Sequence, residues 1–263
     1  MERDQRIVSE AHMKDIIGIL DSGVGGISVL RRAVQLLPNE NFLFYGDNAN
    51  APYGPRSLAE IRSLSRQATD YLLSRDVKAL VIACNTITSA HAETLRAEVS
   101  IPVIGMEPAV KPASLARSGG KILALATRAT LSLERFSRLM EHYGEGVIPL
   151  EGKGLVELVE AGRANSPEAR AALGAIFEPY LDQQIDGIVL GCTHYPFLRR
   201  QIEAFFPKAQ IFDGLDGTAR QLKRRLEDAK LLSTQTTAGQ ISFETSGGKD
   251  KLELMRELFT AEL

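Results

Sequence analysis

Short apolar runs alternate with amphipathic segments along most of this chain, and nearly every run ends in a glycine or a polar loop. The runs are rich in Ile, Val and Leu, which is typical of strands buried on both faces of a parallel sheet. The strands are expected at residues 16–20, 41–45, 79–83, 101–105, 121–126, 186–191, 210–212 and 241–243.

Between the strands, apolar residues recur every three or four positions, which predicts helices that cover the sheets. Two helix starts carry capping signals: Ser57 and Glu60 fit a capping box, and Ser166 precedes Pro167 at a first helical position. The helices are expected at residues 27–37, from 57, at 89–100, from about 130 to 142, from 166, at 197–206, from 218 and from 249.

The order of the elements repeats along the chain. In each half a strand, a turn and a helix lead to a strand that ends in cysteine, from Asp21 to Cys84 and from Thr127 to Cys192. This alternation predicts an α/β protein of two similar lobes, each a mainly parallel sheet flanked by helices. Ligands bind at the carboxyl ends of strands in open α/β sheets, so the active site is expected in the cleft between the lobes.

The lobes are expected to share the chain unequally. Residues 1–108 and 215–263 would form the N-terminal lobe that carries Cys84, and residues 109–214 the second lobe that carries Cys192. The first 15 or so residues have weak periodicity and are expected to be a tail before the fold begins.

Composition excludes several classes of protein. The chain has 263 residues, 44% of them hydrophobic, which is enough for a substantial core. Its 31 basic and 33 acidic residues give no overall attraction to nucleic acid or membranes. No apolar stretch approaches the ~18 residues of a membrane span, and the polar start has no signal-peptide core. A cytoplasmic protein is expected, in which Cys84 and Cys192 stay reduced rather than form a disulfide.

The two cysteines suggest acid–base chemistry at a stereocentre. Removing a proton from one face of a carbon and returning it to the other requires a base and an acid on opposite sides, and a thiolate and a thiol can supply them. Cys84 and Cys192 each follow a strand and precede a helix, whose N-terminus can bring a thiol toward a neutral pKa. The alternative is that both are small buried apolar residues.

The glycine-rich turn at residues 21–26 suggests a cradle of backbone amides for an anion. It is not a P-loop, and Ser28 occupies the third glycine position of a dinucleotide fingerprint. Asp21 would repel a pyrophosphate, and is better placed to hold a substrate ammonium group or to exchange a proton with a thiol.

Further polar residues lie beside the cysteines. His194 can tune Cys192 as a proton relay, or can simply be a loop histidine. A zinc site from Cys84, Cys192 and His194 matches no common zinc spacing. Threonines in the loops after the strands can donate hydrogen bonds to substrate carboxylates; they are Thr86, Thr127, Thr130 and Thr193.

Taken together, these segments resemble the glutamate racemases of the aspartate/glutamate racemase superfamily. The motifs are Asp-Ser-Gly-Val-Gly-Gly at 21–26, Tyr-Gly-Asp at 45–47, Pro-Tyr-Gly at 52–54, Ala-Cys-Asn-Thr at 83–86, Ile-Gly-Met-Glu-Pro-Ala at 104–109 and Gly-Cys-Thr-His-Tyr-Pro at 191–196. The resemblance implies an amino-acid racemase that interconverts L- and D-glutamate without pyridoxal phosphate, metal or other cofactor. It also implies a cytoplasmic homodimer that supplies D-glutamate for peptidoglycan and binds neither nucleic acid nor membrane.

The same resemblance implies roles for individual residues. Cys84 would act on D-glutamate and Cys192 on L-glutamate, assisted by Asp21, His194 and Glu160. Substrate binding would fall to Asp21, Ser22, Tyr53, Gly54, Asn85, Thr86, Thr127, Thr130, Thr193 and His194. The chain departs from the family at residues 150–155, which lack the usual Ala-Cys-Pro.

Three other functions remain open at this point. A sister racemase for aspartate would use the same pair of cysteines. An NAD-dependent dehydrogenase is suggested by Gly23, Gly25 and the acidic Asp47 after the next strand. A non-catalytic two-lobed binding protein would share the fold but would not need paired thiols.

Overall fold

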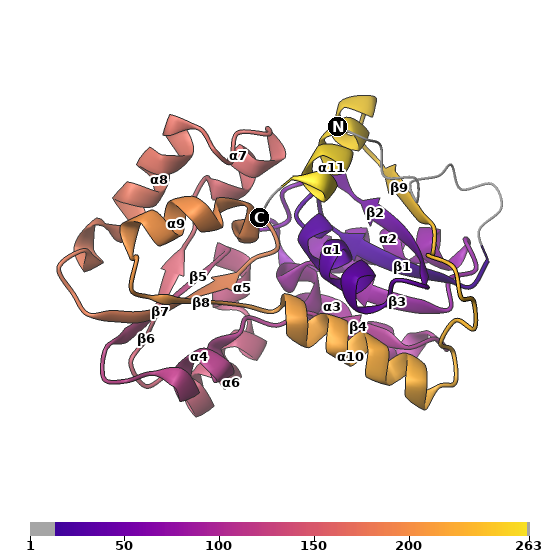
Figure 1. Ribbon diagram of the computed structural model, residues 1–263, viewed down its shortest axis with the longest axis horizontal. Coiled ribbons are helices and arrows are strands. Elements are labelled where there is room, and N and C mark those ends of the chain that lie inside the picture. Colours follow the sequence, from indigo (N-terminus) through magenta and orange to yellow (C-terminus); the bar gives the residue numbers. More distant parts are fainter. Residues whose placement is uncertain (1–13, 262–263) are drawn as a thin grey trace.

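Two parallel sheets form the framework of the protein (Figure 1). The computed structural model describes residues 14–261. The first sheet has the strand order β4 (Val103–Gly105), β3 (Ala79–Ile82), β1 (Ile16–Asp21), β2 (Asn41–Gly46) and β9 (Ile241–Thr245). The second has the order β6 (Val147–Glu151), β5 (Lys121–Ala126), β7 (Ile185–Gly191) and β8 (Gln210–Asp213). Because every neighbouring pair is parallel, all strands of a sheet end at the same edge.

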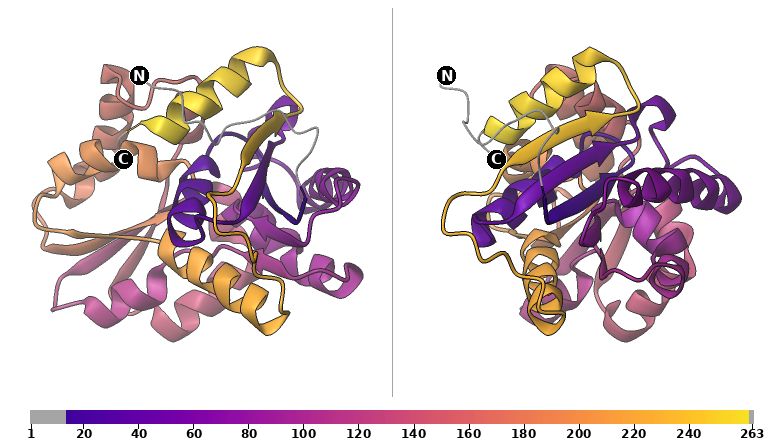
Figure 2. Two further views of the ribbon diagram at one scale, coloured as in Figure 1. Left: turned by 45° about the vertical axis from the view of Figure 1, so that its right-hand side comes forward. Right: turned by 90° about the vertical axis from the view of Figure 1, so that its right-hand side faces the viewer.

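Helices cover both faces of the first sheet (Figure 2). They are α1 (Ile27–Leu36), α2 (Leu58–Leu73), α3 (Asn85–Glu98), α10 (Leu215–Asp228) and α11 (Lys249–Thr260), with a 3₁₀ turn at Asn48–Asn50. Strand β1 shows how the sequence produces this arrangement, since its side chains alternate between faces. Ile17 and Ile19 join the core beneath α1, α10 and α11, whereas Ile16 and Leu20 join the core beneath α2 and α3. We call this sheet with its helices the first unit.

The second unit is layered in the same way. Its helices are α4 (Val110–Ala116), α5 (Arg128–Ser132), α6 (Glu134–Tyr143), α7 (Leu155–Glu160), α8 (Pro167–Phe177) and α9 (Arg199–Phe205), with 3₁₀ turns at Glu178–Tyr180 and Tyr195–Leu198. Leu123 and Leu125 of β5 pack toward α7, α8 and α9, and Ile122 and Ala124 toward α4 and α6. The expected α/β class, with two parallel sheets flanked by helices, is confirmed.

The capping signals are confirmed, but several element boundaries differ from the prediction. Ser57 forms the reciprocal capping box with Glu60, and Ser166 caps α8. The helix expected up to residue 142 is two helices, because Leu133 between them is extended. Helix α3 begins at Asn85 instead of residue 89, so that Cys84 becomes its N-cap residue. Helix α10 begins at Leu215 instead of residue 218.

One strand and two short helices were not predicted: β6, α4 and α7. Strand β6 lies at the edge of the second sheet, where Pro149 is tolerated because an edge strand has one free side. Helix α4 is short and contains Pro112 in its first turn, which hides its periodicity. The expected N-terminal tail falls mostly on residues 1–13, outside the described part of the chain. Within residues 14–261, no helix combines the length and apolar character needed to cross a bilayer.

Candidate active site

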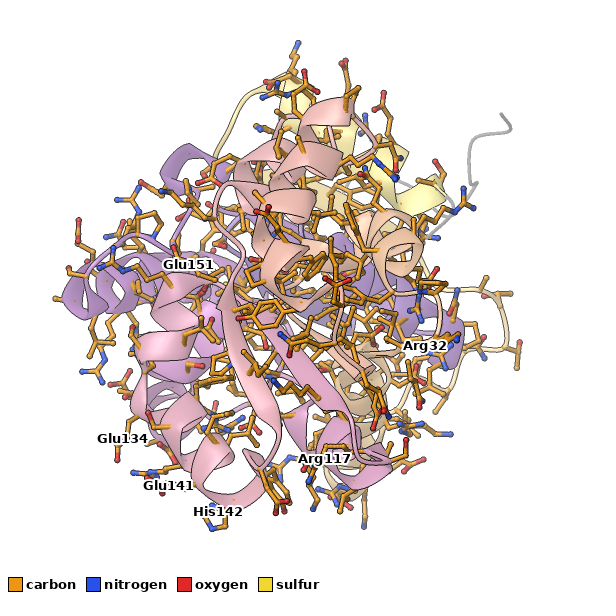
Figure 3. All side chains as sticks on the ribbon, turned by 90° about the vertical axis from the view of Figure 1, so that its left-hand side faces the viewer. Arg32, Arg117, Glu134, Glu141, His142 and Glu151 are labelled. Atoms are coloured by element: carbon orange, nitrogen blue, oxygen red, sulfur yellow. The ribbon has the colours of Figure 1, made fainter. Side chains whose placement is uncertain are left out.

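Both cysteines open into one cavity of about 700 Å³ at the strand ends of the two units. Its wall comes from the segments after β1, β2, β3, β5, β6 and β7, so both units contribute to it. Figure 3, which shows the second unit from outside, places Glu151 of this wall at the end of β6, well away from His142 at the end of α6. The predicted site residues that line the cavity are Ser22, Tyr53, Gly54, Cys84, Asn85, Thr86, Thr127, Cys192, Thr193 and His194. Asp21, Thr130 and Glu160 lie behind this wall.

Cys84 is held as a neutral thiol. It follows β3, caps α3, and its Sγ lies 3.4 Å from the Ser22 hydroxyl. Burial, followed by the charge of Asp21, raises the pKa of this thiol to about 12, although hydrogen bonds with Ser22 and the Ile87 amide lower it. The expectation that the helix N-terminus brings this thiol near a neutral pKa is therefore wrong, because desolvation dominates.

Cys192 has a different neighbour. Its Sγ lies 3.6 Å from His194 Nδ1, and His194 Nε2 lies 2.8 Å from Glu160 Oε1. Burial lowers the pKa of His194, but its hydrogen bonds with Cys192 and Glu160 outweigh burial and raise that pKa well above its ordinary value. The histidine is thus a cation beside one sulfur, whereas the other sulfur lies near a carboxyl group.

Glu160 supplies the negative charge that holds this histidine. Burial raises the pKa of the Glu160 carboxyl, but hydrogen bonds from His194 and the Val24 amide, and the charge of Lys251, bring it below its usual range. The Val24 amide lies 2.6 Å from Oε1, and the Asn48 side-chain amide 2.9 Å from Oε2. The carboxylate therefore stays ionised although it is largely buried.

The glycine-rich turn after β1 is explained by this contact between the units. The anion that its Val24 amide binds is the protein's own Glu160 carboxylate. A Cβ atom at Gly23 would lie 1.9 Å from Glu160 Oε1, and one at Gly25 would lie 2.3 Å from His194 Nδ1. The glycines thus allow the second unit to approach the turn, and this use of the turn argues against the dinucleotide interpretation.

Asp21 is fully buried between the two units. Its carboxylate accepts hydrogen bonds from the Gly23 amide at 2.9 Å and from the Thr193 hydroxyl at 3.1 Å. Burial raises the pKa of Asp21 to about 6, although the charge of His194 lowers it. Because Asp21 does not line the cavity, the geometry favours proton exchange over direct contact with a substrate ammonium group.

Polar groups suited to a carboxylate cover another part of the wall. The hydroxyls of Thr86 and Thr127 lie 3.0 Å apart, and Thr130 lies behind them, 3.3 Å from Thr86. The Asn85 side chain is 2% exposed, lines the cavity, and has no hydrogen-bond partner for either amide atom among the described residues. Since an unpaired buried amide costs free energy, Asn85 is poised to bind a polar ligand.

The remaining supports were missed by the sequence analysis. Tyr53 donates to Asp47 Oδ2 at 2.5 Å, and Ser246 donates to Asp47 Oδ1 at 2.6 Å. Lys251 reaches Glu160 from α11, 91 residues away in the sequence, a pairing that no local pattern could indicate. Three cations also line the cavity: Arg56, Arg128 and Lys153. Across residues 14–261, no three histidine, cysteine or acidic side chains are grouped so as to hold a metal ion.

An aspartate racemase from Picrophilus torridus shares the fold alone, with 18% identity, a TM-score of 0.54, and coverage of 82% of this chain and 95% of that one. Glutamate racemases are much more similar. The enzyme from Clostridium perfringens is 47% identical over 247 residues, which cover 92% of this chain and 95% of that protein.

Solved structures of glutamate racemases are also similar to this chain. Glutamate racemase isoform RacE1 from Bacillus anthracis has a TM-score of 0.83 and 31% identity, covering 94% of each chain. Escherichia coli glutamate racemase, in complex with L-glutamate and the activator UDP-MurNAc-ala, has a TM-score of 0.82 and 28% identity, covering 94% of this chain and 96% of that one. The Asp/Glu/Hydantoin racemase family matches residues 17–222. The family resemblance of the motifs is thus confirmed, and the chain belongs to the Asp/Glu/Hydantoin racemase family.

Proposed function

We propose that this protein is a glutamate racemase that moves the α-proton between two thiols without a cofactor. The observation that carries the proposal is that Cys84 and Cys192, from equivalent strand ends of the two units, line one cavity. The similarity to glutamate racemases over 92% of the chain supports glutamate as the substrate.

The surroundings of the two sulfurs suit a reaction that begins with L-glutamate. Cys192, beside the His194 imidazolium, serves as the thiolate that removes the α-proton. Cys84, a thiol in the resting protein, gives its proton to the opposite face of the carbon, which yields D-glutamate. In the reverse direction Cys84 removes the α-proton of D-glutamate and the Cys192 thiol returns one. Cys84 must therefore first give its proton to the buried Asp21 carboxylate, and Cys192 must take one from His194.

The cavity wall also suits a dicarboxylate. The free amide of Asn85 and the hydroxyls of Thr86 and Thr127 can bind carboxylate oxygens. Arg128 and Lys153 add positive charge near the anionic substrate, which favours its entry.

The test is incubation with L-glutamate in deuterated water, followed by chiral analysis and mass spectrometry. We expect D-glutamate with one α-deuterium, and about a 10²- to 10⁴-fold loss of kcat in Cys84→Ser and in Cys192→Ser. L-Aspartate in a parallel incubation should be converted far more slowly. Undiminished racemisation in both Cys84→Ala and Cys192→Ala would exclude the two-thiol mechanism, and preferred turnover of aspartate would reassign the substrate.

Further parts of the proposal concern the protein's setting. We place it in the cytoplasm, where its thiols stay reduced, as a homodimer that supplies D-glutamate for peptidoglycan. We divide the lobes as residues 1–108 with 215–263, and residues 109–214, a division supported by the pairing of β9 with β2. Sedimentation equilibrium tests the dimer.

A further inference from the structure

Glu160 is the point at which the C-terminal helix of the first unit meets the catalytic residues of the second. Lys251, in the first turn of α11, places its Nζ 2.6 Å from the Glu160 backbone oxygen and 3.5 Å from Oε2 of the same residue. The backbone oxygen belongs to the last residue of α7, where a helical carbonyl has no partner within its own helix. One ammonium group therefore holds both the main chain and the side chain of Glu160.

This contact lies within a largely buried environment. The Glu160 side chain is 11% exposed and that of Lys251 is 25% exposed. An ion pair with so little solvent around it is screened less than a surface pair, so its geometry is better fixed. The other side of Glu160 faces His194, 2.8 Å away, and His194 faces the Cys192 sulfur.

A second restraint reaches Glu160 from the same end of the chain. Thr245, the last residue of β9, donates to Asn48 Oδ1 at 2.7 Å, and the Asn48 amide donates to Glu160 Oε2. Residues 245–251 thus support Glu160 both directly, through Lys251, and through Asn48.

We propose that Lys251 is a positioning residue for the racemase: it fixes Glu160, and Glu160 in turn keeps His194 within hydrogen-bond reach of Cys192. The inference rests on the proposed two-thiol reaction and adds that α11 of one unit sets the geometry of the base in the other. It assigns Lys251 to the Cys192 half of the reaction. The Cys84 half relies on Ser22 and Asp21, and it meets the Cys192 half through the Thr193 hydroxyl, which donates to Asp21 and lies 3.4 Å from His194 Nδ1.

The two enantiomers of glutamate have equal free energy, so a substitution must lower kcat/KM by the same factor in both directions. A comparison of kcat/KM values therefore cannot assign the effect to one half of the site. Deuterium at the α-carbon of the substrate provides that measurement. If proton removal by Cys192 becomes slower, the isotope effect on kcat grows with α-deuterated L-glutamate. With α-deuterated D-glutamate, whose proton Cys84 removes, the isotope effect should stay the same or fall, because the slower step is then the return of a proton from Cys192.

The experiment compares Lys251→Met with Lys249→Met, which removes an exposed ammonium group from the same turn of α11. We expect Lys251→Met to lower kcat with L-glutamate about 5- to 10-fold, with a smaller change in KM, as for a lost charged hydrogen bond. Its isotope effect should rise with the L-enantiomer only. Lys251→Arg should recover most of kcat, and Lys249→Met should match the parent protein.

The outcomes separate this inference from the proposed function. An active parent whose Lys251→Met variant loses only thermal stability, with unchanged kcat and isotope effects, overturns the positioning role. Equal growth of both isotope effects also overturns it, because the effect would then not be confined to Cys192. A parent that fails to racemise glutamate overturns the proposed function and this inference with it. If Lys251→Met does not fold, the same measurements on Lys251→Gln decide.

Discussion

At the scale of single residues, two identical side chains have opposite electrostatic surroundings. Cys84 faces the Asp21 side of the site and is kept protonated, whereas Cys192 faces a histidine held as a cation by Glu160. The sequence predicted both thiols from their repeated setting after a strand. It could not predict the raised pKa of Cys84, because desolvation depends on what the whole fold packs around the sulfur.

The same burial makes Asp21 destabilising above its pKa. Its pKa is about 6 in the folded protein against an ordinary 3.8, so the folded state binds the proton more tightly than the unfolded state. The free energy of unfolding therefore falls as the pH rises from about 4 to about 6, and stays lower above that range. Asp21→Asn should be more stable than the parent at pH 7 by about 2 to 3 kcal/mol, with slower racemisation. Urea unfolding between pH 4 and pH 8 measures the difference, which should vanish at the acid end.

Asp186 provides a control of opposite sign. Hydrogen bonds from Gln184 and from the Ser118 amide lower the pKa of this partly exposed carboxyl. The Asp186 carboxylate therefore stabilises the folded protein at any pH above its unfolded pKa, and this stabilisation is lost as the pH falls through its folded pKa. Asp186→Asn should accordingly be less stable than the parent at pH 7. If Asp21→Asn is also less stable at pH 7, Asp21 does not carry the burial penalty described here.

At the scale of elements, strands buried on both faces were the most predictable part of the fold. Strands β1, β5 and β7 are continuous apolar runs bounded by glycine or polar residues, and the structure places them near the expected positions. The edge strand β6 was not predictable, because its side chains are only partly buried and Pro149 interrupts the pattern. Short helices such as α7 owe their formation to tertiary packing, which no periodicity within six residues can reveal.

Gly23 and Gly25, in the turn after β1, should not tolerate a side chain. A Cβ atom at Gly25 would overlap His194 Nδ1 and Thr193 Oγ1, so Gly25→Ala should cost about 1 to 3 kcal/mol of stability. It should also lower kcat at least tenfold, because His194 would have to move. Urea unfolding and chiral assays of the purified variant measure both effects.

Gly217→Ala is the matched control for that substitution. Gly217 lies in the first turn of α10, with nothing within 4 Å of the added atom. Alanine should stabilise the protein there by up to about 1 kcal/mol and leave kcat unchanged. If both substitutions leave stability and kcat equally unaffected, the close approach of the two units at Gly25 does not constrain the residue at that position.

At the scale of the whole molecule, the site exists only because two units place their strand ends around one cavity. Residues that line it were predictable where they stand beside a motif, as Asn85 and Thr193 do. The contacts that support them were not, because partners such as Ser246 and Asp47 lie 199 positions apart. Their pairing depends on the return of the chain to the edge of the first sheet through β9.

Glutamate should therefore stabilise the protein as a whole. In the double variant Cys84→Ser/Cys192→Ser, which holds substrate without turnover, L-glutamate at 100 times its Kd should raise the free energy of unfolding by about 2.7 kcal/mol. The expected rise in Tm is on the order of 5 to 10 °C, measured by thermal denaturation. NAD⁺ serves as the negative control. A larger shift with NAD⁺ than with glutamate would revive the dehydrogenase hypothesis.

The position of β9 and α11 in the chain affects how the protein matures during synthesis. Glu160 and His194 leave the ribosome long before Lys251, so the nascent chain holds most residues of the candidate site before Lys251 can support them. Activity should therefore start late in translation, when this last strand and helix have emerged and docked.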